Sequence, residues 1–155
     1  MRARSAVRAS VNVGPVPLSE AHAGRSYPPT PAYEITAAKI SEFAAALGDD
    51  NPAYRGNSPS APPTLVAMLA FAAWDQMFAD LDLELELRRI IHTDQRFTYV
   101  RPLRAGDRVT ATLTIDKVRT RATTESMSCS IQVRDSGGEV TCTAASTLMH
   151  SRQAA

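Results

Sequence analysis

A carboxylate, an amide and a phenol lie close together in the segment LGDDNPAYR, residues 47–55. Asp49 could move a proton or accept hydrogen bonds, and Asn51 and Tyr54 could hold a polar group of a substrate. A phenol, with a pKa of about 10, is a poor general base at neutral pH. The segment therefore has an acid and two polar groups suited to acid–base chemistry, but it has no imidazole.

The base could come from elsewhere in the chain. His92 is the one histidine expected well inside the fold, and an imidazole titrates near neutral pH. Asp49 and His92 are therefore the candidate catalytic residues. Each also has a plainer interpretation, because Asp49 could cap a loop by accepting backbone N–H groups and His92 could be structural or lie at an interface. We expect His22 and His150 to be exposed.

A helix must position Asp49. Residues 36–48 place Ile40 and Leu47 on one apolar stripe, and the Thr36 hydroxyl can cap the first turn. Gly48 ends the pattern, because glycine adopts the left-handed conformation without strain. Asp49 is therefore predicted to follow the end of this helix directly.

A second, longer helix is predicted over residues 64–81, and it is apolar almost all the way round. Such a helix is buried on most sides, so we expect it at the centre of the fold. Pro62 and Pro63 precede it and have no N–H, so the first free amides belong to Thr64 and Leu65. These amides could stabilise an oxygen that gains negative charge, or they could simply begin a buried helix.

The remainder of the chain alternates with the period of two that is typical of strands. Residues 81–87 alternate leucine with acidic residues and indicate an edge strand or an extended link. Four longer strands follow, over residues 92–103, 108–121, 123–135 and 139–151. The residues predicted to face inward are Phe97, Tyr99, Val109, Ala111, Leu113, Ile115, Met127, Cys129, Ile131, Val133, Val140, Cys142 and Ala144.

Composition narrows the class of protein. The chain has 155 residues and a net charge of +1, which gives no electrostatic reason to expect nucleic acid or a membrane surface as partner. It has no apolar run of about 18 residues and no secretory signal, so we expect a cytoplasmic protein. The two cysteines and three histidines show no metal-ligand spacing. We predict a flexible tail over residues 1–24, one domain over 25–151 and a short tail over 152–155.

Three segments and the closing threonine-rich strands carry a family resemblance: GRSYPPTPAYEITAAKISEFAAALGDDNPAY, APPTL and IIHTDQRFTYVRPLRAGDRV. Between about residues 24 and 151 the chain resembles the MaoC-like hydratases and dehydratases. Within them it resembles FAS1-type dehydratase N-terminal domains and HadA-type subunits of (3R)-hydroxyacyl-ACP dehydratases. The resemblance implies an α+β hot-dog fold, a curled antiparallel sheet wrapped around a long central helix, and pairing of chains edge to edge.

The resemblance also implies a reaction. Catalytic members carry the pattern Gly-Asp-x-Asn-Pro-x-His, and here Gly48-Asp49 and Asn51-Pro52 match it while Tyr54 stands at the histidine position. HadA-type subunits lack the catalytic pair and shape the acyl channel for a MaoC-like partner. We therefore expect a subunit of a (3R)-3-hydroxyacyl-thioester dehydratase or hydratase in fatty-acid or polyketide assembly. It would act on acyl-ACP or acyl-CoA, without metal or redox cofactor, and bind substrate through Asn51, Tyr54, Thr64 and Leu65.

Other functions stay open at this point. The chain could be a self-sufficient homodimeric enoyl hydratase that uses Asp49 and His92, a non-catalytic acyl-thioester binding protein, or a hot-dog thioesterase. A set of basic residues on the strand half is either a solvated face or a surface that steers an acidic carrier protein or a coenzyme phosphate. These residues are Arg96, Arg101, Arg104, Arg108, Lys117, Arg119 and Arg121.

Overall fold

The structure is a computed structural model of the chain, and it describes residues 18–152. It confirms the predicted α+β class, with one antiparallel sheet and a central helix. The helices are α1 (Ala37–Leu47) and α2 (Val66–Phe78), and the strands are β1 (Tyr33–Glu34), β2 (Ile90–Tyr99), β3 (Arg108–Arg121), β4 (Thr124–Asp135) and β5 (Val140–Ser151).

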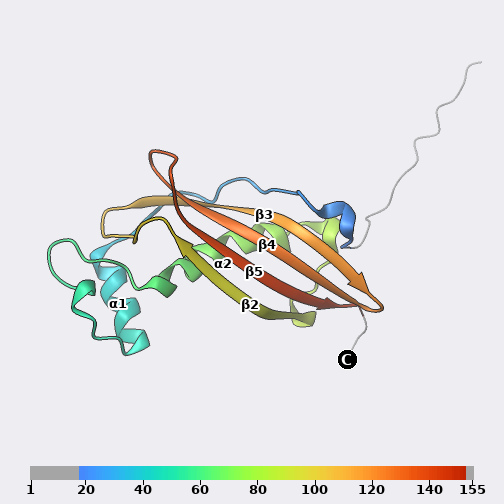
Figure 1. Cartoon of the computed structure of the whole chain (residues 1–155), viewed down its shortest axis with the longest axis horizontal. Coiled ribbons are helices and arrows are strands. Elements are labelled where there is room, and N and C mark those ends of the chain that lie inside the picture. The colour runs from blue at the N-terminus through green and yellow to red at the C-terminus, as the bar shows by residue number, and fades with distance from the viewer. Residues whose placement is uncertain (1–17, 153–155) are drawn as a thin grey trace, which may run out of the picture.

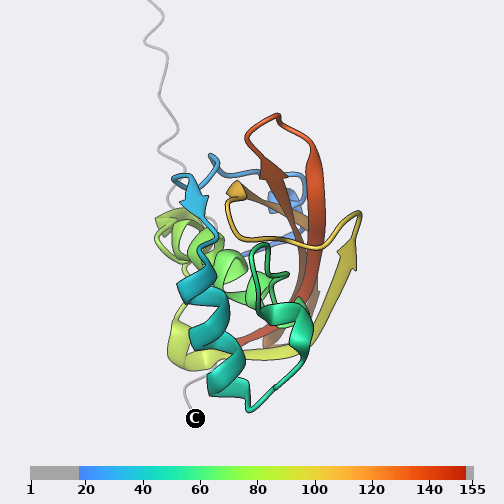
Figure 2. The ribbon, with the colours of Figure 1, turned by 90° about the vertical axis from the view of Figure 1, so that its left-hand side faces the viewer.

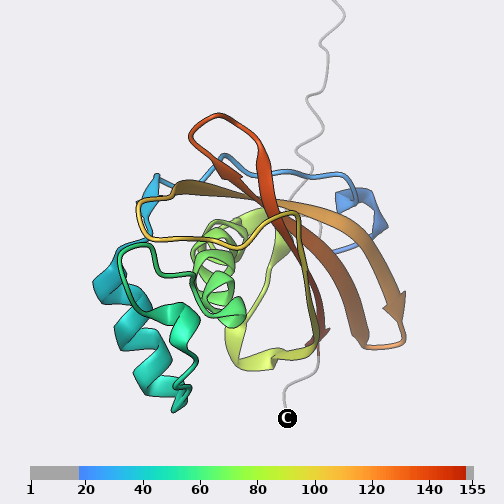
Figure 3. The ribbon, with the colours of Figure 1, turned by 60° about the vertical axis from the view of Figure 1, so that its left-hand side comes forward.

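The five strands form one sheet in the order β1-β3-β4-β5-β2, and every neighbouring pair is antiparallel. The four long strands run side by side across the molecule (Figure 1). Seen close to end-on, α2 lies inside the curve of the sheet while α1 lies outside it (Figure 3). This is the wrapped helix of a hot-dog fold.

The signals predicted for α1 are those that form it. The Thr36 hydroxyl accepts a hydrogen bond from the backbone N–H of Lys39 at 3.1 Å, and Gly48 ends the helix at φ 65° in the left-handed region. Ile40 and Ala44 are buried. Figure 2 shows α1 in the foreground, followed by the loop that carries the candidate acid.

The helix α2 begins slightly later than predicted. A 3-10 turn over Pro63–Leu65 precedes Val66, the first α-helical residue. Leu69, Ala73 and Met77 are each no more than 6% exposed, because the inner face of the sheet covers them. The predicted role of α2 as the core element is confirmed.

Strand faces follow the predicted alternation except where the pairing shifts register, as it does between Ile115 and Lys117 of β3. The inward-facing positions of β3 and β4 are buried, and Cys129 and Cys142 are buried free thiols. The pairing of β4 with β5 shifts between Val133 and Arg134, which indicates a bulge. As a result Val140, predicted to face inward, is half-buried, while Thr141 is buried and donates its hydroxyl to the Val133 carbonyl at 3.1 Å.

The strand or extended link predicted over residues 81–87 is wrong. The chain there forms two 3-10 turns, Leu81–Leu83 and Leu87–Arg89. The Asp80 carboxylate caps the first turn by accepting the N–H of Asp82 at 3.1 Å, and Glu84 turns the chain at φ 49°. Of the acidic residues that looked like one face of a strand, Glu84 turns the backbone, whereas Asp82 and Glu86 form ion pairs with arginines.

The ordered fold begins before the predicted boundary at residue 25. Leu18 is 1% exposed, and a segment that continues from it runs along the free side of β3. Gly24 donates its N–H to the Ile115 carbonyl at 2.7 Å, and Tyr27 donates to Leu113 at 2.9 Å. This edge of the sheet is therefore covered, whereas within residues 18–152 no further strand pairs with the outer edge of β2. The predicted tail up to residue 17 and residues 153–155 lie outside the described residues.

The expectation that two of the histidines are exposed to solvent is also wrong. His22 and His150 are 6% and 7% exposed, because the N-terminal segment and the loop before β2 pack over them. In the described part of the chain, no helix is long and apolar enough to cross a membrane.

Candidate active site

The loop after α1 is closed by the side chains that the sequence marks as candidates. The Asp49 carboxylate accepts the backbone N–H of Asn51 at 3.1 Å and the hydroxyl of Tyr54 at 3.0 Å. The Asn51 side-chain oxygen in turn accepts the N–H of Ala53 at 2.9 Å and caps the 3-10 turn Pro52–Tyr54. Asp49 therefore caps the loop through one carboxylate oxygen, as its structural interpretation predicts, and its second oxygen accepts the hydrogen bond from the phenol.

Tyr54 is the anchor of this loop. Its side chain is 8% exposed and packs into the core, while its hydroxyl reaches Asp49. Burial and the neighbouring carboxylate both raise the pKa of Tyr54 above its usual value of 10, so the phenol stays protonated at neutral pH. It is a hydrogen-bond donor and cannot act as the base of the site.

A hollow of about 330 Å³ opens beside this pair, lined by α1 and the loop that follows it. Asp50 and Arg55 lie on its rim as an ion pair, with 2.6 Å between Oδ1 and Nη2. The other lining residues are Ser41, Ala44, Ala45, Gly48, Asp49 and Tyr54.

His92 belongs to a different part of the molecule. It lies on β2, where its ring packs edge-to-face on Trp74 with 5.0 Å between centroids. Its Nε2 lies 2.9 Å from the backbone oxygen of Asp94 and donates to it. Across residues 18–152, no contact joins His92 to Asp49. One chain therefore does not bring the two predicted catalytic residues together.

Trp74 lies on α2, the helix that the sequence predicts at the centre of the fold. Trp74 is 6% exposed and contacts Phe71, Phe78 and His92 edge-to-face. Among the described residues, its indole N–H is the one buried side-chain donor without a partner. This aromatic cluster connects α2 with the inner face of β2, the edge strand.

The start of α2 offers fewer free amides than predicted. The N–H of Leu65 is donated to the Pro62 carbonyl at 2.9 Å, so it is not available to a substrate oxygen. Thr64 is exposed and remains the candidate donor. The Tyr99 hydroxyl donates to the Pro63 carbonyl and fixes this turn against β2. An apolar hollow of about 210 Å³ lies here, lined by Ala61, Pro63, Tyr99 and Pro102.

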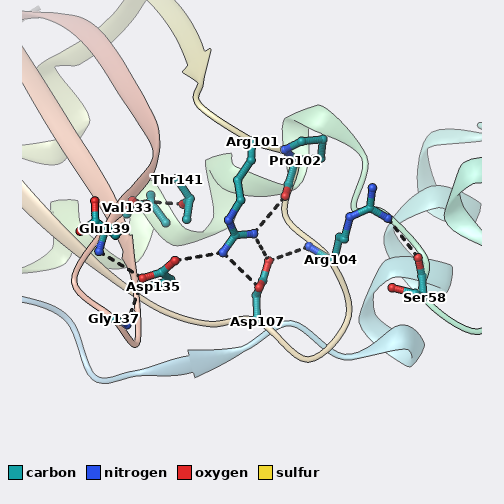
Figure 4. A network of polar contacts seen from close by, with 10 residues as sticks. All are labelled: Ser58, Arg101, Pro102, Arg104, Asp107, Val133, Asp135, Gly137, Glu139 and Thr141. Carbon is teal, nitrogen blue, oxygen red and sulfur yellow. Dashed lines mark hydrogen bonds and ion pairs between the residues drawn. The ribbon is translucent and has the colours of Figure 1, made fainter.

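Arg101 holds the loop between β2 and β3 in place (Figure 4). Its guanidinium contacts the Asp107 carboxylate at 2.7 and 3.2 Å and the Asp135 carboxylate at 3.2 Å. Asp107 also accepts the backbone N–H of Arg104 at 2.8 Å. The Ala61 N–H donates to the Leu103 carbonyl at 2.8 Å, so the same loop is tied to the segment that leads into α2.

A second polar cluster lies where the N-terminal segment, β4 and β5 meet, and sequence reasoning missed it. Glu125 is 1% exposed, contacts His150 Nδ1 at 2.9 Å and accepts a hydrogen bond from Arg152. Arg152 also donates to the Leu18 carbonyl at 3.1 Å. Long-range partners of this kind leave no local signal in a sequence.

Within the described residues no group of three His, Cys, Asp or Glu is placed to hold a metal ion.

Comparisons with known proteins agree with this architecture. The family model of the FAS1-like dehydratase domain region matches residues 21–144. The UPF0336 protein PPA1896 of Cutibacterium acnes is 49% identical over 87% of this chain and 95% of its own length. A UPF0336 protein of Thermobifida fusca is 36% identical over 85% of this chain and 93% of its own length.

Solved structures show the same fold. The C-terminally truncated HadBC (3R)-hydroxyacyl-ACP dehydratase complex of Mycobacterium tuberculosis is similar with a TM-score of 0.73 and 27% identity, covering 83% of this chain and 96% of that chain. A MaoC-like dehydratase has a TM-score of 0.74 at 23% identity, covering 84% of this chain and 42% of that chain, which shows the fold alone. The chain therefore belongs to the FAS1-like dehydratase-domain family, has a hot-dog fold, and is also a member of the UPF0336 proteins.

Proposed function

We propose that the chain is one subunit of a two-chain enzyme that dehydrates (3R)-3-hydroxyacyl thioesters and hydrates the corresponding enoyl thioesters. The observation that carries the proposal is the contact between Tyr54 and Asp49. A phenol that stays protonated occupies the position where catalytic chains of the resembled pattern carry histidine. The base therefore comes from another chain, a MaoC-like partner with its own Asp and His.

The reaction is an elimination by general acid–base catalysis. The partner's imidazole takes a proton from C2 of the acyl group, the C3 hydroxyl leaves as water after it gains a proton, and a trans-2-enoyl thioester remains. Negative charge develops on the thioester oxygen, and backbone N–H groups stabilise such a charge. The backbone N–H of Thr64, an exposed residue, is the donor that this chain would contribute. The chemistry uses no metal ion or redox cofactor.

The partner would pair with the outer edge of β2. The opposite side of the sheet is covered by the N-terminal segment, whereas no strand within residues 18–152 covers the outer edge of β2. This edge is flanked by Ile91 and Val100, which are 66% and 75% exposed. Exposed apolar residues on an open edge are typical of a surface that another strand covers. The similar HadBC structure is itself a complex of two chains.

The acyl group would lie between α2 and the inner face of the sheet. Phe71 and Trp74 on α2 and Phe97 on β2 provide apolar side chains close to the open edge. The pathway would be fatty-acid or polyketide assembly, with the acyl group on acyl carrier protein or coenzyme A. In this arrangement the chain shapes the channel and its partner performs the proton transfers.

The test is an assay of the purified chain on crotonyl-CoA, alone and together with a MaoC-like chain. We expect hydration by the pair and none by this chain alone. Activity of the chain alone that disappears in His92→Ala would instead support a self-sufficient homodimer. Binding without turnover in every pairing would indicate a binding protein, and release of free thiol would indicate a thioesterase.

A further inference from the structure

Arg101 and Arg104 lie in the same loop but differ in their ionic partners. Arg101 contacts two carboxylates and a backbone carbonyl, so its charge is neutralised within the fold. Arg104, three residues later, has no carboxylate within ion-pair distance among residues 18–152. Its guanidinium makes one long hydrogen bond, 3.4 Å to the carbonyl of Ser58 (Figure 4).

The backbone that carries Arg104 is held firmly although the side chain is exposed. Its N–H donates to Asp107 at 2.8 Å, and Arg104 pairs with Ser60 in an isolated bridge. The next residue, Ala105, donates to the Pro59 carbonyl at 3.0 Å. A charged side chain on a fixed backbone loses less conformational freedom on binding than one on a mobile loop.

The loop that carries Arg104 also lines an apolar hollow. Pro102, two residues before Arg104, contributes to this hollow of about 210 Å³ at the start of α2, together with Ala61, Pro63 and Tyr99. A loop that offers both an apolar hollow and an arginine without an anionic partner is complementary to a ligand with a slender, uncharged arm and a phosphate at its end.

We propose that Arg104 binds the phosphate of the pantetheine arm that carries the acyl thioester, with the arm lying along the hollow. The proposal rests on the proposed function, because it places the thioester at the start of α2. Coenzyme A and acyl carrier protein share this phosphorylated arm, and the site recognises the arm in both. Arg101 is then a positioning residue that keeps the loop of Arg104 against the segment before α2.

The test compares two ligands that differ by one phosphate, butyryl-pantetheine and butyryl-4′-phosphopantetheine. Both acyl groups are saturated, so no turnover interferes with calorimetry on the full chain in complex with its partner. We expect the phosphorylated ligand to bind about tenfold more tightly to the wild type, which is the size of a charge-assisted hydrogen bond. In Arg104→Gln this ratio falls towards one, while binding of butyryl-pantetheine is unchanged.

Arg119→Gln is the matched control. Arg119 is exposed on β3, near the hairpin to β4, and also has no carboxylate partner among the described residues. The control should keep the tenfold ratio, and Arg104→Lys should keep part of it. A wild-type ratio near one, an unchanged ratio in Arg104→Gln, or an equal loss in Arg119→Gln would each overturn the proposal.

Two further ligands identify the source of the arm. Butyryl-CoA and a butyryl carrier protein should both lose affinity in Arg104→Gln by the same factor as butyryl-4′-phosphopantetheine. A loss confined to the carrier protein would mean that Arg104 contacts the protein surface and would overturn the assignment to phosphate. These binding measurements need no turnover. A failure of the dehydratase assay can therefore be distinguished from a failure of phosphate binding by Arg104.

Discussion

The hydroxyl of Tyr54 donates a hydrogen bond of 3.0 Å to the carboxylate of Asp49, across a loop of four intervening residues. The contact involves a phenol whose pKa is raised by burial and by the carboxylate, so it stays protonated at neutral pH. It also uses the carboxylate oxygen that would otherwise orient an imidazole. In this loop a hydrogen-bond donor therefore stands at the position that is histidine in the pattern Gly-Asp-x-Asn-Pro-x-His.

Restoring an imidazole should restore part of the chemistry. In Tyr54→His the ring would lie beside Asp49, which can orient it and stabilise its charged form. We expect this variant alone to hydrate crotonyl-CoA at least about tenfold faster than the wild-type chain alone. Tyr54→Phe, which removes the hydroxyl and supplies no base, is the control and should stay inactive. Equal rates for the two variants would show that the loop lacks more than a base.

Substitution of Gly48 tests whether its left-handed backbone conformation contributes to stability. Its φ of 65° lies in the left-handed region, where a Cβ costs about 1 kcal/mol. Gly48→Ala should lower the free energy of unfolding by about that amount, as measured by urea denaturation. Asparagine tolerates this conformation better, so Gly48→Asn should lose less. If both variants lost the same stability, backbone strain would not be the cause.

Arg101 should matter more for stability than other exposed arginines. Arg101→Met leaves Asp107 and Asp135 without their shared cation. Because these groups are partly exposed, we expect a loss of only about 1 kcal/mol, seen as a fall in Tm of about 3 °C. Arg96→Met, on the exposed face of β2, should change stability by less than about 0.5 kcal/mol. A similar fall in both variants would contradict the assignment of a fixed network to Arg101.

His150 should make the fold sensitive to mild acid. Burial lowers the pKa of His150 below its usual 6.5, and the nearby charge of Arg89 lowers it further. The unfolded chain then binds the proton more readily than the folded chain, so this contribution to stability is complete above the unfolded pKa and is lost as pH falls below it.

The matching experiment is urea denaturation at about pH 7.5 and about pH 5, compared with His150→Gln. Glutamine can still contact Glu125 and the N–H of Glu86 but does not titrate in this range. We expect the variant to lose less stability than the wild type between the two pH values. An unchanged pH dependence would show that His150 is not the group responsible.

Local signals predicted much of this fold. The cap at Thr36 and the left-handed residue Gly48 fixed both ends of α1, because each acts within one turn of the helix. The alternation of buried residues along β3 and β4 likewise follows from the sequence, since one face of each strand meets α2. The helix predicted over 64–81 corresponds to α2, but its first turn is a 3-10 turn and it ends at Phe78, before the predicted end at Leu81.

The errors in burial and in the start of the fold arose where partners distant in the sequence decide the outcome. His150 is buried because Glu125, 25 residues away, and the N–H of Glu86 both meet it. Leu18 belongs to the fold because its N–H and carbonyl are bound by Leu83 and Arg152. No periodicity records such contacts. The separation of His92 from Asp49 likewise depends on how β2 is placed beside α2.

The most direct test of the borrowed base is made in the active pair itself. This chain carries Asp49→Asn and His92→Ala together, its MaoC-like partner is left unchanged, and hydration of crotonyl-CoA is followed at saturating substrate. We predict that kcat falls by less than about threefold, whereas His→Ala in the partner's Gly-Asp-x-Asn-Pro-x-His motif lowers it by at least about 100-fold. The account would be contradicted if the double variant of this chain lowered kcat by about 100-fold while the His→Ala variant of the partner remained active.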